Sequence, residues 1–133
     1  MTSRASGDLV DTLARTAQDM PGIELLLLFG SRAREESHSR SDWDLGYLAT
    51  SDADPATLRA RLVEVLGTDR VDLVDLERAG GLLRYRAARD GQLVFEARRG
   101  VGDRFRLEAA RFWCDAASVL QRGYDDVLAD LKR

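Results

Sequence analysis

The stretch LLLLFGSRAREESHSRSDWDLGYL, residues 25–48, decides the fold of this chain. Its first residues are apolar, as expected for a buried strand, and this run ends at Gly30 and Ser31. Because glycine lets a ligand approach the backbone closely, such a turn can present backbone N–H groups to a phosphate. The turn is therefore a candidate phosphate-binding loop.

Two aspartates open the second half of the stretch, separated from Ser31 by the ten residues 32–41. Asp42 and Asp44 flank Trp43, and residues two apart on a strand face the same side of the sheet. Both carboxylates are then expected to point together, with Trp43 on the opposite face. Convergent carboxylates beside a phosphate-binding turn are typical of a site for a nucleotide with Mg²⁺.

The segment VDLVDL, residues 71–76, predicts a further strand that offers Asp72 or Asp75 as a third carboxylate. These two residues are three apart and face opposite sides of the strand, so only one of them can join Asp42 and Asp44. Three carboxylates around two Mg²⁺ ions suit nucleotidyl transfer, in which a hydroxyl attacks the α-phosphate and pyrophosphate leaves.

The length, net charge and composition of the chain exclude several classes of protein. A chain of 133 residues predicts a single domain over 1–133, with residues 1–7 as a disordered start. The net charge of −3 argues against nucleic acid as the main partner. The longest apolar run, 23–29, is interrupted by Glu24 and is too short to span a membrane. One cysteine, Cys114, and one histidine, His38, exclude an intrachain disulfide and a zinc cluster. These features predict a cytoplasmic protein.

Hydrophobic periodicity and turn residues predict an α+β fold: a small mixed β-sheet with helices packed on it and a long C-terminal helix. Asp54 and Pro55 mark one helix start, and Gly67 marks its end. The long helix can kink at Gly123. The expected helices are 8–20, 54–66, 81–89 and 103–133, with a short helix or turn at 33–36, and the expected strands are 23–29, 42–49, 71–76 and 92–97.

The spacing of Gly30-Ser31, ten residues and Asp-x-Asp resembles the nucleotidyltransferase signature of the DNA polymerase beta superfamily. GSRAR followed by SDWDLGYL looks most like its minimal nucleotidyltransferase (MNT) branch. The resemblance covers at least residues 23–76 and implies the nucleotidyltransferase fold. In that family the third acidic residue lies in a VDLV-like strand, which favours Asp72 over Asp75.

The resemblance also implies a role for each motif residue. Three carboxylates would be both catalytic and metal-ligating: Asp42, Asp44 and Asp72. Asp72 would complete the attacking-side Mg²⁺ and help deprotonate the acceptor hydroxyl. The turn would bind the β- and γ-phosphates of ATP, the co-substrate, through Gly30, Ser31 and Arg32.

MNT proteins of this size resemble the antitoxin half of HEPN–MNT toxin–antitoxin pairs, which implies transfer of AMP from ATP to a tyrosine hydroxyl of a HEPN toxin. About 55 residues follow the third strand, too few for an acceptor domain, so we expect another chain to supply the acceptor. Two alternatives stay open. One is a small-molecule nucleotidyltransferase of aminoglycoside type that works as a homo-oligomer. The other is an antitoxin that only binds, its site weakened by Glu35 and Glu36.

Overall fold

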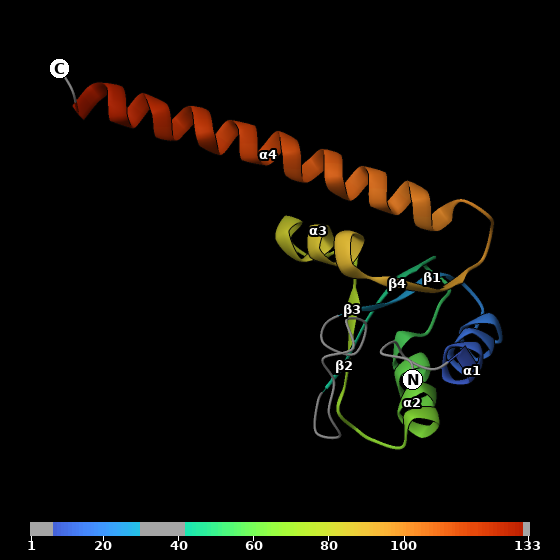
Figure 1. Cartoon of the computed structure of the whole chain (residues 1–133). Coiled ribbons are helices and arrows are strands. Elements are labelled where there is room, and N and C mark those ends of the chain that lie inside the picture. The colour runs from blue at the N-terminus through green and yellow to red at the C-terminus, as the bar shows by residue number, and fades with distance from the viewer. Residues whose placement is uncertain (1–6, 30–41, 132–133) are drawn as a thin grey trace.

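The computed structural model describes residues 7–29 and 42–131, apart from the side chains at 117–120, 124, 127, 128 and 130. The expected α+β class and the long C-terminal helix are confirmed (Figure 1). The elements run in the order α1 (Gly7–Gln18), β1 (Ile23–Phe29), β2 (Trp43–Ala49), α2 (Pro55–Leu66), β3 (Val71–Asp75), α3 (Gly81–Asp90), β4 (Gln92–Glu96) and α4 (Val101–Leu131).

Several boundaries differ slightly from the expected ones. Gly7 already belongs to α1, β2 begins one residue after Asp42, and α4 begins at Val101 rather than at Asp103. Hydrophobic periodicity defines the middle of an element better than its ends, where capping and tertiary contacts decide. The expectations for 1–6 and for a short helix or turn at 33–36 lie outside the described residues.

The strands form one mixed sheet in the order β3-β2-β1-β4. β1 pairs antiparallel with both β2 and β4, whereas β2 pairs parallel with β3. A parallel pair needs a crossover connection, and α2 provides it between β2 and β3. The mixed sheet expected from the sequence is thereby confirmed.

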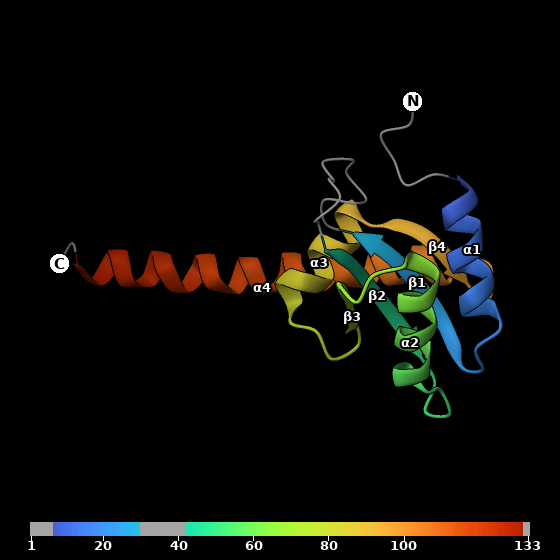
Figure 2. The same cartoon turned by 90° about the horizontal axis from the view of Figure 1, so that it is seen from below.

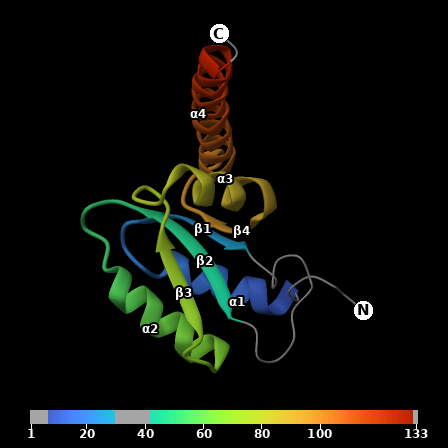
Figure 3. The same ribbon diagram turned by 90° about the vertical axis from the view of Figure 1, so that its left-hand side faces the viewer.

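β1 is covered on both faces, which explains why its residues 25–29 are all apolar. Leu26 and Leu28 pack in a core between the sheet and helices α1 and α2. Leu25 and Leu27 pack in a second core on the other face, between the sheet and helices α3 and α4. All four side chains are 0% exposed. Figure 3 shows the sheet between these two helical layers.

The crossover helix α2 begins and ends where its sequence predicts. The Asp54 carboxylate accepts a hydrogen bond from the backbone N–H of Thr57 at 3.3 Å, and Pro55 occupies the first turn. Gly67 ends the helix in the left-handed conformation, with φ at 70°. The predicted start and stop of this helix are confirmed.

Only the first part of α4 packs on the body of the protein. Phe105 and Ala109 are buried in the α3–α4 core, and the Trp113 ring stacks on Tyr85 of α3 with centroids 5.7 Å apart. Beyond these contacts α4 extends away from the sheet (Figures 1 and 2). It passes straight through Gly123, so the kink expected there is absent. In the described part of the chain, no helix has the length and apolar character needed to cross a membrane.

Gly46 gives a test of the packing between β2 and the residue that follows β3. A Cβ atom at Gly46 would lie 2.7 Å from Cδ2 and 2.8 Å from Cγ of Leu76, whose side chain is fully buried. We expect Gly46→Ala to lower the free energy of unfolding by about 1–3 kcal/mol, measured by urea denaturation.

The matched control is Gly123→Ala, because nothing lies within 4 Å of a Cβ at that helical position. This control is expected to keep or slightly raise the free energy of unfolding, since alanine favours a helix. Equal stability of the two variants would contradict the packing argument.

Candidate functional site

The parallel pairing of β2 with β3 places two carboxylates side by side. Asp44 lies opposite Asp72 in the register, one step beyond the pair Trp43 and Val71. The N–H of Trp43 donates to the carbonyl oxygen of Arg70 at 2.9 Å, which holds the start of this register. Residues opposite one another in a parallel pair face the same side, so Asp44 and Asp72 both face α3, while Trp43 and Val71 pack in the α1–α2 core.

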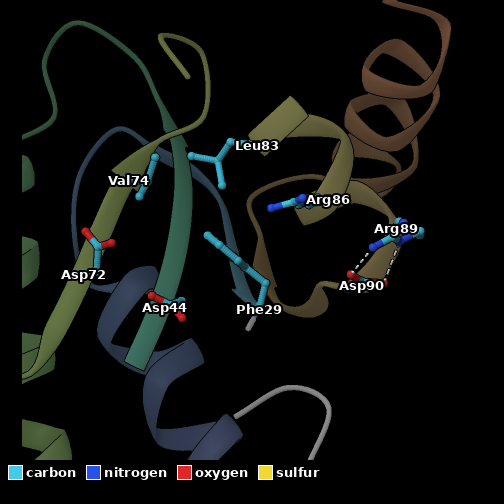
Figure 4. Close-up of a pocket in the computed structure, with 8 residues that line it drawn as sticks. All are labelled: Phe29, Asp44, Asp72, Val74, Leu83, Arg86, Arg89 and Asp90. Atoms are coloured by element: carbon cyan, nitrogen blue, oxygen red, sulfur yellow. Dashed lines mark hydrogen bonds and ion pairs between the residues drawn. The ribbon is translucent and has the colours of Figure 1, made fainter. Parts of the chain in front are cut away.

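A cavity of about 430 Å³ opens between this edge of the sheet and α3 (Figure 4). The two carboxylates lie on its strand side, and charged side chains of α3 lie on the other side. Apolar side chains from β1, β3 and α3 complete the wall. The full lining is Phe29, Asp44, Asp72, Val74, Leu83, Arg86, Arg89 and Asp90.

The electrostatics of the cavity centre on Asp44. Partial burial, and next the negative charges of Asp72 and then Asp42, raise the pKa of Asp44 above its ordinary value of 3.8. Each of these causes disfavours the ionised carboxylate. A cation bound at this point would offset all of them.

The α3 side of the cavity was not predicted as part of the site. Arg89 is held by Asp90 through two hydrogen bonds of 2.9 Å, from Nε to Oδ1 and from Nη2 to Oδ2. Arg86 points into the cavity and makes no ion pair with any of the described residues (Figure 4). Leu83 and Arg86, three apart on a helix, share one face, but only the tertiary structure shows that this face meets the sheet.

Asp42 lies apart from the main cavity. It is exposed, directly precedes β2, and lines a neighbouring hollow of about 260 Å³ together with Asp69 and Asp72. Asp72 borders both spaces. The structure thus brings Asp44 and Asp72 to one cavity and leaves Asp42 at its margin, near enough to raise the pKa of Asp44.

Asp75 lies on the other face of β3. It is opposite Tyr47, whose pKa is raised first by burial and then by the charge of Asp75. The Asp75 carboxylate accepts a hydrogen bond from the backbone N–H of Glu77 at 3.0 Å and lies 3.8 Å from Nε of Arg78. These contacts make Asp75 a turn former, and Asp72 is the aspartate of β3 on the cavity face.

The residues expected to bind phosphate, Gly30, Ser31 and Arg32, lie outside the described residues. Phe29, the last described residue before them, lines the cavity. The sequence motif therefore continues directly from one wall of this site.

The carboxylate oxygens of Asp44 and Asp72 that line the cavity are of the type that Mg²⁺ prefers as ligands. In the two described ranges, no three histidine, cysteine, aspartate or glutamate side chains are grouped closely enough to hold a metal ion. Proteins commonly bind Mg²⁺ through only one or two carboxylates, with waters and substrate phosphates as the remaining ligands. Asp44 and Asp72 match that number of carboxylates. The pKa of Asp44 is raised first by burial and then by the charges of Asp72 and Asp42, and a bound cation would favour its ionised form against both.

Comparison with known families and curated proteins gives consistent matches. The family described as "Polymerase beta, Nucleotidyltransferase" matches residues 11–99. Two curated relatives are each named "Protein adenylyltransferase MntA". The one from Aphanizomenon flos-aquae is 26% identical over 110 residues, which cover 74% of this chain and 73% of the relative. The one from Shewanella oneidensis is 28% identical over 115 residues, covering 84% and 81%.

Solved structures show the same fold. A crystal structure of a toxin–antitoxin with AMP-PNP matches with a TM-score of 0.70 and 26% identity, covering 93% of this chain and 99% of that one. A structure of a tri-AMPylated Shewanella oneidensis HEPN toxin in complex with an MNT antitoxin matches with a TM-score of 0.65 and 25% identity, covering 90% and 96%.

The burial of Asp44 and the like charges beside it predict a gain in stability when this carboxylate is removed. Because the folded-state pKa of Asp44 is raised, its ionisation destabilises the fold; the cost is absent below pH 3.8 and complete above the raised value. In Mg²⁺-free buffer at neutral pH, Asp44→Asn should therefore raise Tm by a few degrees, measured by scanning calorimetry. The gain should shrink as the pH falls toward 3.8. A lower Tm for Asp44→Asn at neutral pH would contradict this account.

Proposed function

Because the chain belongs to the polymerase beta nucleotidyltransferase family, we propose that it transfers AMP from ATP to a tyrosine hydroxyl of a HEPN toxin and thereby acts as its antitoxin. The observation that carries this proposal is the pairing of Asp44 with Asp72 at one cavity. Two further findings support it: the curated relatives are named protein adenylyltransferases, and a similar structure contains an AMPylated HEPN toxin.

On the donor side, ATP would lie with its β- and γ-phosphates on Gly30, Ser31 and Arg32. Two Mg²⁺ ions would be held by Asp42, Asp44 and Asp72, together with phosphate oxygens and water. When bound, these ions neutralise the charge that develops on the attacking and leaving oxygens.

On the acceptor side, the hydroxyl oxygen attacks the α-phosphorus of ATP, and the bond from that phosphorus to the bridging β-phosphate oxygen breaks. Pyrophosphate leaves, and the hydroxyl proton must be lost. A tyrosine hydroxyl has a pKa near 10, so it needs a base beside it. Asp72 is suited to accept this proton, since it is exposed and borders both the main cavity and the hollow beside it.

A separate polypeptide as acceptor is supported by the size of the similar proteins. This chain spans 99% of the matched chain in the toxin–antitoxin structure with AMP-PNP and 96% of the matched chain in the AMPylated complex. The matched chains thus have almost no sequence beyond this core that could form an acceptor domain.

Transfer to the toxin can be tested by incubating the protein with labelled ATP, Mg²⁺ and its HEPN partner. We expect the partner to gain AMP on a tyrosine, located by mass spectrometry. Asp44→Asn and Asp72→Asn should each lower the initial rate by about 100-fold or more, because each removes a charge that acts on the transition state.

The matched control is Asp75→Asn, which makes the same change on the same strand but on the opposite face. It should keep the wild-type rate within about threefold. Labelling of an aminoglycoside and not of the toxin would instead support the small-molecule alternative. Full protection of cells by the Asp44→Asn/Asp72→Asn double variant would support neutralisation by binding alone.

Nucleotide binding gives a test that needs no toxin. Mg·ATP should raise the Tm of the wild-type protein in a concentration-dependent way, since a ligand that binds only the folded state stabilises it. Chelation of Mg²⁺ with EDTA should remove most of this rise, and so should Asp44→Asn. An equal rise with and without Mg²⁺ would show that the carboxylates do not bind the donor through a metal.

A further inference from the structure

We propose that Arg86 binds phosphate oxygens of the donor nucleotide from the α3 side of the cavity, opposite Asp44 and Asp72. The inference rests on the proposed function, since it takes ATP with Mg²⁺ as the donor. It adds a residue that lies outside the Gly-Ser and Asp-x-Asp motif.

The position of Arg86 is the first observation that supports phosphate binding. It lies on α3, and its side chain points from this helix into the cavity, toward the strands that carry the carboxylates (Figure 4). Phe29, Val74 and Leu83 supply the apolar wall between the two charged sides.

The neighbouring arginines of α3 lie against other groups of the protein. Arg84 lies over the ring of Phe105, with its guanidinium carbon 5.8 Å from the ring centroid. Arg89 is held by both oxygens of Asp90. Arg86 has no such contact with any of the described residues, so its guanidinium is available to a ligand.

The charges on the two sides of the cavity select the ligand. A bare phosphate would be repelled by Asp44 and Asp72, and a bare cation would leave Arg86 unmatched. A polyphosphate with bound Mg²⁺ satisfies both sides, because it presents the ion to the carboxylates and oxygen atoms to the arginine. The planar guanidinium can donate two parallel hydrogen bonds to such oxygens, a geometry that the ammonium group of lysine lacks.

Binding of Mg·ATP and of Mg·tripolyphosphate, measured by isothermal titration calorimetry, tests this assignment on the full chain. Arg86→Gln should weaken the binding of both ligands by about tenfold to a hundredfold, the usual effect of losing a charged hydrogen bond. Arg86→Lys should recover part of the loss. Arg104→Gln, the same change at an exposed position outside the cavity lining, should bind within about twofold of wild type.

The outcomes separate this inference from the proposed function. Wild-type affinity of Arg86→Gln for Mg·tripolyphosphate would overturn the assignment, and labelling of the toxin by the wild-type protein would still support AMP transfer. Absence of toxin labelling together with Arg86-dependent binding would overturn the function and keep the phosphate site. An equal loss of adenosine binding in Arg86→Gln would also overturn the assignment, because adenosine carries no phosphate.

Discussion

Strand β1 is the element on which the rest of the fold depends. It is hydrogen-bonded to β2 along one edge and to β4 along the other, and helices cover both of its faces. Leu25–Leu28 are fully buried, so they contribute several kcal/mol of apolar burial to two cores at once. Because β1 ends at the cavity with Phe29, the strand that organises the cores also positions the candidate site.

The charges at the candidate site destabilise the folded protein. The register of β2 and β3 places Asp44 beside Asp72. Partial burial of Asp44, and then the like charge of Asp72, both disfavour its ionised form. Buried apolar pairs on the same strands, Trp43 with Val71 among them, hold the register despite this cost. Ionised Asp44 therefore lowers the stability of the fold, and a positive charge in the cavity would offset that cost.

A structural feature could be predicted from the sequence where its cause lies within one helix or strand. The separation of Asp72 from Asp75 follows from alternation along one strand. The structure agrees, because their partners face opposite sides of the sheet: Asp44 faces the cavity and Tyr47 the α1–α2 core. The position of Arg86 at the cavity was not predicted. It depends on how α3 packs against the sheet and α4 through the buried side chains of Ala87 and Ala88. The start of β2 after Asp42 was missed for the same reason: strand ends follow tertiary pairing rather than residue pattern.

The long helix α4 consists of two parts with different thermodynamic character. Its 31 residues span about 46 Å, yet its buried contacts with the sheet and α3 lie near its start, at Phe105 and Ala109. The remainder projects past the body (Figure 2) and depends on local terms such as the Gln121–Asp125 hydrogen bond of 3.0 Å. Helices without tertiary packing are marginal in water. The far end of α4 therefore opens with a small local free energy of its own, and its amide hydrogens exchange with solvent long before those of β1.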